Sequence, residues 1–259
     1  MPKAGIGRVI QFGGLVVLMA VQLTSQAQNN FQWKDSSGKT RNRSDLDKVL
    51  REHKVWDDLG EFGRKSGTQA DLSGAQLLYA NLSGAHLAYA TLDHASLSGA
   101  SLSHATLNHA MLDHADQSDA TLDHADLRDA EMSDTHLADA KLDHASLFGA
   151  NLAGAMLPFA DLSGADLRNA NLVGASVIGA KLDGAVFEPN SLPELHQIAA
   201  AQNLELLTYY ANPDALVQLR KQFEDGGFRE QERKITYAVK RREAQLSGTI
   251  RMWINKVLF

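Results

Sequence analysis

The chain has 259 residues, of which 44% are hydrophobic and 22% charged, values that are ordinary for a globular protein of one or two domains. It contains no cysteine, which excludes disulfide bonds, thiolate catalysis and cysteine-based metal sites. The formal net charge of −6 is unevenly distributed, because residues 70–187 carry 15 Asp and Glu against four Lys and Arg, a net of −11, which leaves +5 for the remainder.

The first segment, residues 1–27, reads as a secretory signal peptide. It has a basic start with Lys3 and Arg8, an apolar run over residues 9–23, and a small-x-small cleavage signal ending at Ala27. The apolar run is short for a membrane-spanning helix, which needs about 20 residues, but an uncleaved anchor stays an alternative. Both interpretations predict that the rest of the chain is exported to a periplasmic, extracellular or membrane-associated location.

Residues 28–69 form a polar lead-in with one predicted helix. Ser44 and Asp47 are typical of a helix start, and glycines at 60 and 63 end the pattern. Residues at helical spacing share one face of this helix: Leu46, Val49, Leu50, His53 and Trp56. We expect this face to cover the open end of the next domain, with His53 packed beneath it; a functional role for His53 is the alternative.

Residues 70–187 consist of 24 consecutive units of the form Ala-x-Leu-x-x. Two residues depart from the apolar pattern: Gln117 replaces a leucine, and Thr135 replaces an alanine. Five residues advance an α-helix by about 500°, and in a flat strand an odd period alternates sides, so neither element keeps the leucines together. The chain must turn within each unit, which indicates a solenoid whose units bury their apolar sides by stacking.

The stretches AQLLYANLSGAHLAYA and AMLPFADLSGADLRNANLVGA closely resemble the repeats of pentapeptide-repeat proteins. The resemblance implies a mainly β fold with α-helical flanks: a right-handed, four-sided β-helix of about six coils, roughly 29 Å long. It also implies that leucine and alanine point inward. The expected core includes Leu72, Leu92, Leu112, Leu127, Leu147 and Leu167. Gln117 and Thr135 would then lie on one side, one coil apart, with the Thr135 hydroxyl as partner of the buried amide.

The last residue of each unit faces solvent, and at every tenth position it is Gly, His or Asp. With 20 residues per coil, several histidines fall in columns on opposite sides of the rod. Stacked imidazoles beside carboxylates are candidate ligands for a divalent metal. The candidates are His104, His124, His144, Asp123 and Asp143. We favour the simpler interpretation, duplication of a ten-residue unit whose turn accepts these residue types.

Residues 188–259 are predicted to form an α-helical module. A capping-box pattern at Ser191 starts a helix of about 16 residues that reaches Tyr209 or Tyr210. A second helix begins near Asp214, and its apolar face holds Leu216, Leu219 and Phe223. A third runs from Arg229 to about Ala244 and packs through Ile235, Ala238 and Val239. The charged stretch resembles a helical tail of some bacterial membrane-associated members, which makes membrane contact an alternative to a solvated face.

No nucleophile, base and orienting group fall together, so no enzyme activity and no cofactor are predicted. The main hypothesis is an exported repeat protein whose acidic rod binds or scaffolds another protein, with no nucleic-acid partner. The resemblance implies an alternative, because some family members mimic DNA and bind type II topoisomerases; the acidic rod fits this, but the signal peptide opposes it. The stacked histidines suggest a third hypothesis, metal- or pH-responsive binding.

Overall fold

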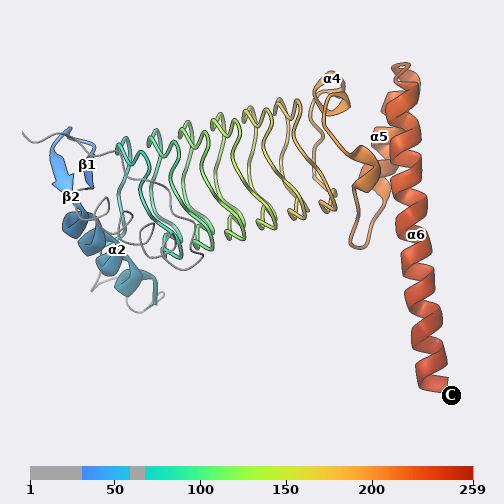
Figure 1. Cartoon of the computed structure of the whole chain (residues 1–259), viewed down its shortest axis with the longest axis horizontal. Coiled ribbons are helices and arrows are strands. Elements are labelled where there is room, and N and C mark those ends of the chain that lie inside the picture. The colour runs from blue at the N-terminus through green and yellow to red at the C-terminus, as the bar shows by residue number, and fades with distance from the viewer. Residues whose placement is uncertain (1–30, 59–67, 259) are drawn as a thin grey trace, which may run out of the picture.

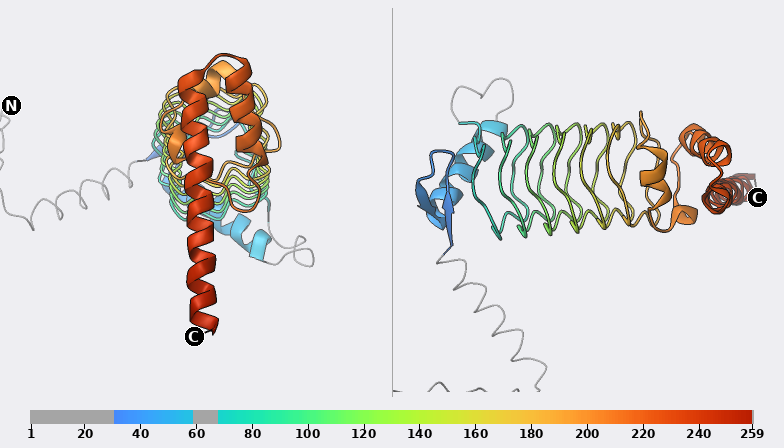
Figure 2. Two further views of the ribbon diagram at one scale, coloured as in Figure 1. Left: turned by 90° about the vertical axis from the view of Figure 1, so that its right-hand side faces the viewer. Right: turned by 90° about the horizontal axis from the view of Figure 1, so that it is seen from above.

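The computed structural model describes residues 31–58 and 68–258; the expected signal segment lies outside these ranges. Three parts follow one another along a single axis: an N-terminal cap, a rod, and a helical C-terminal module (Figure 1). The cap and the C-terminal module lie at opposite ends of the rod (Figures 1 and 2).

The rod is held together by backbone pairing between residues that are 20 positions apart. Asp71 pairs in parallel with Thr91, and the same offset recurs along the rod. The inward leucines from Leu72 to Leu172 also donate their amide protons to the next coil, as Leu72 does to the Thr91 carbonyl at 2.7 Å. Four five-residue units therefore complete one coil. The pairs are single bridges rather than extended strands, because the chain turns again after every unit.

Each unit contains one β-turn, which keeps the leucines inside. The Ala75 amide donates to the Leu72 carbonyl at 3.0 Å, and Gly74, the third residue of that turn, has a φ of +61°. The left-handed conformation at this position resembles a type II turn. The expected core leucines are all buried: Leu72, Leu92, Leu112, Leu127, Leu147 and Leu167.

The two departures from the pattern are both buried but are not bonded to each other. Thr135 donates its hydroxyl proton to the Leu112 carbonyl at 2.9 Å. The Gln117 amide group has no hydrogen-bond partner among the described residues. The expected bond between Gln117 and Thr135 is therefore wrong, because a backbone carbonyl of the preceding coil lies within reach of the hydroxyl and takes its proton.

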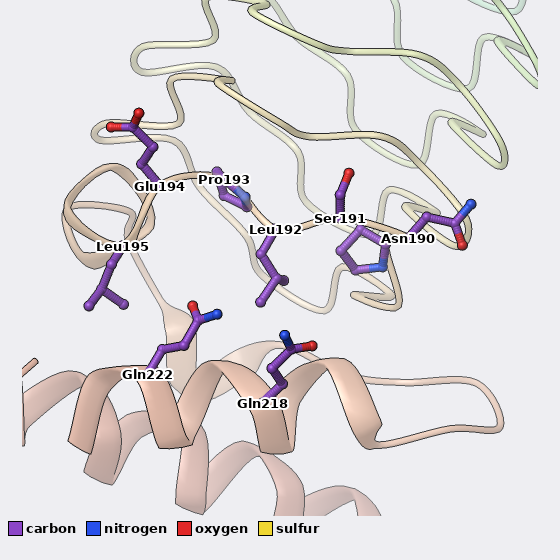
Figure 3. Close-up of a pocket in the computed structure, with 9 residues that line it drawn as sticks. Asn190, Ser191, Leu192, Pro193, Glu194, Leu195, Gln218 and Gln222 are labelled. Atoms are coloured by element: carbon purple, nitrogen blue, oxygen red, sulfur yellow. The ribbon is translucent and has the colours of Figure 1, made fainter. Parts of the chain in front are cut away.

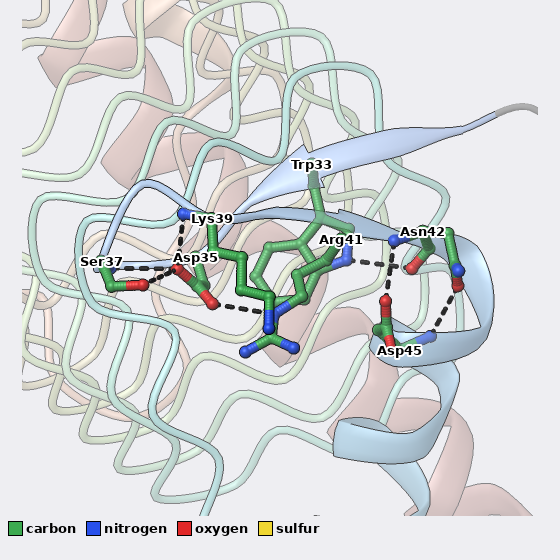
Figure 4. A network of polar contacts seen from close by, with 7 residues as sticks. All are labelled: Trp33, Asp35, Ser37, Lys39, Arg41, Asn42 and Asp45. Atoms are coloured by element: carbon green, nitrogen blue, oxygen red, sulfur yellow. Dashed lines mark hydrogen bonds and ion pairs between the residues drawn. The ribbon is translucent and has the colours of Figure 1, made fainter.

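The N-terminal cap begins with a hairpin that extends the first coil. Strands β1 (Gln32–Lys34) and β2 (Thr40–Asn42) pair antiparallel, and the Lys34 carbonyl accepts a hydrogen bond from the Gln76 amide at 2.8 Å. Asp35 closes the hairpin turn by accepting bonds from Ser37, Lys39 and Arg41 (Figure 4). The Ser37 hydroxyl and the Arg41 guanidinium together lower the pKa of Asp35 to about 2.

Helix α2 (Arg43–Asp58) follows directly from β2. Its start differs from the expected Ser44: the Asp45 amide donates to the Asn42 side chain, and the Asn42 amide donates back to the Asp45 carboxylate (Figure 4). This is a capping box with Asn42 as the first member, because asparagine caps at least as well as serine and its partner three residues on is acidic. The glycines expected to end this helix lie outside the described residues.

The helix α2 docks on the rod through His53, as expected, and through Arg43. His53 is fully buried, and its Nδ1 atom accepts a hydrogen bond from the Ala70 amide at 3.0 Å. Burial lowers the pKa of His53, an effect that the Ala88 backbone partly opposes. Arg43 donates to the Asn81 carbonyl at 2.7 Å. Side chains of the cap thus form hydrogen bonds with backbone groups of the first coil.

At the other end the ladder does not stop where the five-residue pattern stops. Gln202 pairs with Lys181, and Thr208 pairs with Val186. The helix expected from Ser191 to Tyr209 is therefore wrong; only α4 (Leu195–Ala199) and a 3₁₀ turn, η1 (Leu204–Leu206), form there. The exposed edge of the last repeat offers unpaired backbone groups, and this segment satisfies them while burying Ile198, Leu204 and Leu207, among others.

Two helices complete the C-terminal end. Helix α5 (Asp214–Asp225) buries Leu216, Leu219 and Phe223 as predicted. Helix α6 (Arg229–Leu258) buries Ile235 and Ala238 and extends well past the expected end at residue 244. It crosses the end of the rod and projects beyond it (Figures 1 and 2). Among the described helices, none combines the length and the apolarity that a membrane span requires.

Candidate functional site

The exposed surface of the rod is organised by its corners, where the last residue of each unit has positive φ. Asn and Asp tolerate this region better than other non-glycine residues, and histidine is also enriched there. Because each coil has 20 residues, corner residues line up in four rows, which we name by one member. They are the His94 row (74, 94, 114, 134, 154, 174), the Tyr79 row (79, 99, 119, 139, 159, 179), the His104 row (84, 104, 124, 144, 164, 184) and the Tyr89 row (89, 109, 129, 149, 169).

The His104 row stacks as the spacing predicts. The ring centroids of His104 and His124 lie 5.0 Å apart and those of His124 and His144 5.3 Å apart, with the ring planes within 5° of parallel. His94 and His114 stack similarly at 4.9 Å in the opposite row. The lone pair of an imidazole lies in its ring plane, so parallel rings direct their nitrogens alongside one another rather than toward one point.

The carboxylates named as metal ligands do not complete a site with these rings. Asp143 Oδ1 lies 3.8 Å from His144 Nε2 at an exposed corner. One oxygen of Asp123 is buried without a hydrogen-bond partner among the described residues. Across residues 31–58 and 68–258, no three His, Asp or Glu side chains are grouped closely enough to hold a metal ion.

The Tyr89 row connects the N-terminal cap to the rod surface. Trp56 of α2 meets Tyr89 edge-on at 6.3 Å, and Tyr89 stacks on His109 at 4.7 Å. His109 Nε2 then lies 4.0 Å from Asp129 Oδ2. Aromatic contacts of this kind add about 0.5–1.5 kcal/mol each beyond area burial. The row therefore has a structural role at its N-terminal end.

The Tyr79 row was not recognised from the sequence. Tyr79 and Phe159 are 77% and 60% exposed, although each ring lies over the glycine of the next coil. A Cβ atom added at Gly99 would lie 2.5 Å from Tyr79 Cδ1, and one at Gly179 would lie 2.5 Å from Phe159 Cδ1. The sequence pattern that indicates this row is an aromatic residue directly before a repeat alanine, followed by a glycine 20 positions later.

Comparison with known proteins gives the family. A model described as pentapeptide repeats matches eight copies over residues 68–103, 80–116, 118–154 and 150–188. HetL, a pentapeptide repeat protein involved in heterocyst differentiation regulation from Nostoc sp. strain PCC 7120, is 30% identical; the match covers 49% of this chain and 71% of HetL, with a TM-score of 0.25. The chain belongs to the pentapeptide repeat family. Its rod is therefore a right-handed β-helix, the fold of that family.

Two further solved structures are similar to this chain. The pentapeptide repeat protein Rfr23 from the cyanobacterium Cyanothece 51142 is 30% identical, and the match covers 40% of this chain and 62% of Rfr23, with a TM-score of 0.29. QnrB1, a plasmid-mediated fluoroquinolone resistance protein, is 18% identical over 54% of this chain and 82% of its own, with a TM-score of 0.21. No curated protein matches this chain.

This pentapeptide repeat protein carries an excess of negative charge on its rod that its own cations do not neutralise. Three of the four rod cations already pair with aspartate: Arg128 with Asp126, Arg168 with Asp166, and Lys181 with Asp161. The Arg128 hydrogen bond lowers the pKa of Asp126. Of the 15 rod carboxylates, twelve thus have no Lys or Arg partner among the described residues.

The C-terminal end of the pentapeptide repeat protein holds an open pocket of about 450 Å³ between the last coil and α5 (Figure 3). The pocket is lined by Pro189, Asn190, Ser191, Leu192, Pro193, Glu194, Leu195, Gln218 and Gln222. Glu194 is the one charged residue in this lining, and the others are neutral amides, a hydroxyl and apolar groups. Such a lining has no nucleophile paired with a base.

Proposed function

We propose that this protein is an exported, non-enzymatic scaffold whose rigid acidic rod binds a cationic protein partner. The observation that supports this is the set of twelve carboxylates that have no Lys or Arg partner among the described residues, on a surface of regular rows. Adjacent corners in a row are about 4.8 Å apart, so the rod presents charges at regular spacing over roughly 29 Å if it has six coils. Charge complementarity of this kind steers association and favours one sign of partner.

Binding rather than catalysis fits the way polar groups are distributed. They repeat along rows instead of converging on one point, whereas catalysis needs a nucleophile, a base and a stabilising group within about 3 Å of one reacting atom. Repeated groups suit an extended interface, which gains from many weak contacts.

Export is supported by residues 1–27 and is tested by N-terminal sequencing of the protein that accumulates in cells. We expect the mature chain to begin near Gln28 and to fractionate outside the cytoplasm. A full-length cytoplasmic chain that still begins at Met1 would overturn export and favour the topoisomerase-binding alternative.

Partner binding is tested by crosslinking the full chain in its native compartment and identifying what it captures. The proposal expects a protein with a basic surface, whose capture falls steeply between low and high salt because exposed charge pairs are screened. Capture that does not change with salt, or no specific capture, would overturn it.

A further inference from the structure

The Tyr79 row carries two exposed aromatic rings, Tyr79 and Phe159, with exposed carboxylates between them. Tyr79 stands at its N-terminal end and Phe159 four coils later, about 19 Å away at roughly 4.8 Å per coil. Between them the row holds Asp119 and Asp139, which are exposed and make no side-chain hydrogen bond or ion pair with the described residues. The row is thus an acidic centre between two apolar ends.

Neighbouring residues enlarge both apolar ends. Leu78 is 45% exposed beside Tyr79, and Ile178 is 40% exposed in the coil that Phe159 covers. Met156, on the flat side that leads to Phe159, is 39% exposed. An exposed apolar residue alone needs no explanation, but clusters beside polar residues mark interaction surfaces.

We propose that the Tyr79 row is a docking ridge for an extended, cationic segment of a partner protein. The segment has apolar residues at both ends, which cover Tyr79 and Phe159, and Lys or Arg between them, which face Asp119 and Asp139. This proposal rests on the proposed function and places its contact at one corner of the rod.

The spacing of the ridge sets the pattern of the segment. An extended chain advances about 3.3 Å per residue, so apolar anchors that are 19 Å apart are about six residues apart. Residues i and i+6 of a strand lie on the same face, as do i+2 and i+4. These two lie about 7 and 13 Å along the strand, against about 10 and 14 Å along the row for Asp119 and Asp139, so long Lys or Arg side chains are needed to reach both carboxylates. The predicted recognition pattern is therefore apolar-x-basic-x-basic-x-apolar.

Charge argues for a foreign partner rather than a second copy. Two rods packed antiparallel along this row would bring Tyr79 against Phe159, but they would also place Asp119 against Asp119. Like charges directly opposed at an interface cost several kcal/mol. A cationic segment avoids that cost.

The test uses the full chain and a fluorescently labelled peptide, Phe-Ser-Lys-Ser-Lys-Ser-Phe, with binding followed by anisotropy. The ring variant combines Tyr79→Asn with Phe159→Asn, because asparagine tolerates the left-handed backbone of both sites. The acid variant combines Asp119→Asn with Asp139→Asn. The matched control combines Asp129→Asn with Asp134→Asn, which removes the same charge from corners of two other rows.

We expect the ring variant to weaken binding at least about tenfold and the acid variant about three- to tenfold, with a smaller salt dependence. The control should change binding less than about twofold. Unchanged thermal melts will show that all variants are folded. The inference is overturned by equal losses in the acid variant and the control, by no saturable binding to wild type, or by a concentration-dependent dimer that the ring variant abolishes.

Capture of the native partner by the full chain and by the ring variant distinguishes failure of this inference from failure of the proposed function. If the full chain and the ring variant capture the same basic partner equally, the ridge is not the contact but the scaffold function stands. If neither captures a partner, the proposed function itself fails.

Discussion

The interior and the corners of the rod follow the same 20-residue period, but the interior positions hold few residue types and the corner positions hold many. Inside, leucine and alanine recur with almost no change, and every described member of the series is buried or nearly so. At the corners, the same backbone conformation carries glycine, histidine, aspartate, asparagine, tyrosine or phenylalanine. Backbone hydrogen bonds between coils hold both sets in place, but only the interior side chains are packed on all sides.

This difference assigns stability to the interior and specificity to the surface. Removing even one methylene from a packed interior lowers the free energy of unfolding, because neighbouring side chains relax only partly into the space. A corner side chain is at least partly exposed to solvent, so its replacement costs little as long as positive φ is tolerated. The fold can therefore keep one core while its rows vary.

The largest expected effect comes from placing a charge inside. Leu127→Asp or Leu147→Asp buries a carboxylate where both leucines are now fully buried, at a cost of at least several kcal/mol. We expect the middle of the rod to unfold, so that the melting transition seen by circular dichroism is lost. Asp129→Asn, two residues from Leu127 but at a corner, should change the free energy of unfolding by less than about 0.5 kcal/mol. Similar melts for both variants would contradict the comparison.

The second prediction concerns the cap, where the interior pattern meets a helix. His53→Phe should destabilise the cap by about 1–3 kcal/mol, because it leaves the buried Ala70 amide without an acceptor. Hydrogen exchange at the first coil would report the opening. His136→Gln is the control, since His136 is exposed on the rod surface.

The same contact should depend on pH. Burial lowers the pKa of His53 below 6.5, so the folded cap holds the neutral ring, and the unfolded chain takes up a proton first as pH falls. Cap stability should be full above about pH 6.5 and decline below it until the folded-state pKa is reached. In His53→Phe this decline should disappear; if it stays unchanged, another group causes it.

Some of this architecture could be predicted from the sequence, and the errors have physical causes. The period predicted that the chain turns within each unit, because neither a helix nor a strand keeps every fifth residue on one side. The stacking of the leucines in columns came from the resemblance to pentapeptide-repeat proteins. The helix expected after Ser191 failed because its spacing pattern is local, whereas pairing of Gln202 and Thr208 with the last repeat is not. Asn42 was overlooked as a cap because Ser44 also fits the pattern. The Tyr79 row was missed because its members are 20 residues apart in the sequence. Only the geometry of the rod brings them together on one exposed surface.

Gln117 departs from the apolar series of the interior, and its replacement gives a further prediction. Gln117→Leu should stabilise the rod by about 1–3 kcal/mol, since it replaces a buried amide that has no hydrogen-bond partner in the described part of the chain by the residue found in the neighbouring units. Thr135→Ala should cost about 0.5–1.5 kcal/mol through loss of the bond to the Leu112 carbonyl. Because the two side chains are not bonded, a double-mutant cycle by chemical denaturation should be near additive. A coupling energy above about 0.5 kcal/mol would show that they interact.

The smallest effect on the fold, and the sharpest test of the corners, is the response of binding to pH. Eight histidines lie in the rod: His86, His94, His104, His109, His114, His124, His136 and His144. With all of them neutral, the rod carries −11; with all protonated, it would carry −3. Histidine is the side chain that changes charge in mildly acidic solution, so protonation of these rings would reduce the negative charge of the rod as pH falls.

A cationic partner should therefore bind the rod more weakly at pH 5.5 than at pH 7.5. The His104 row holds three of the eight rod histidines, more than any other row of corners, so it should contribute most to the change. A variant with His104, His124 and His144 changed to Asn keeps the left-handed backbone but removes three imidazoles. Its affinity should fall less across this pH range than that of wild type, while its melt at pH 7.5 stays the same. Equal pH responses would mean that this row only fills its turns and that the corners respond to the partner through carboxylates alone.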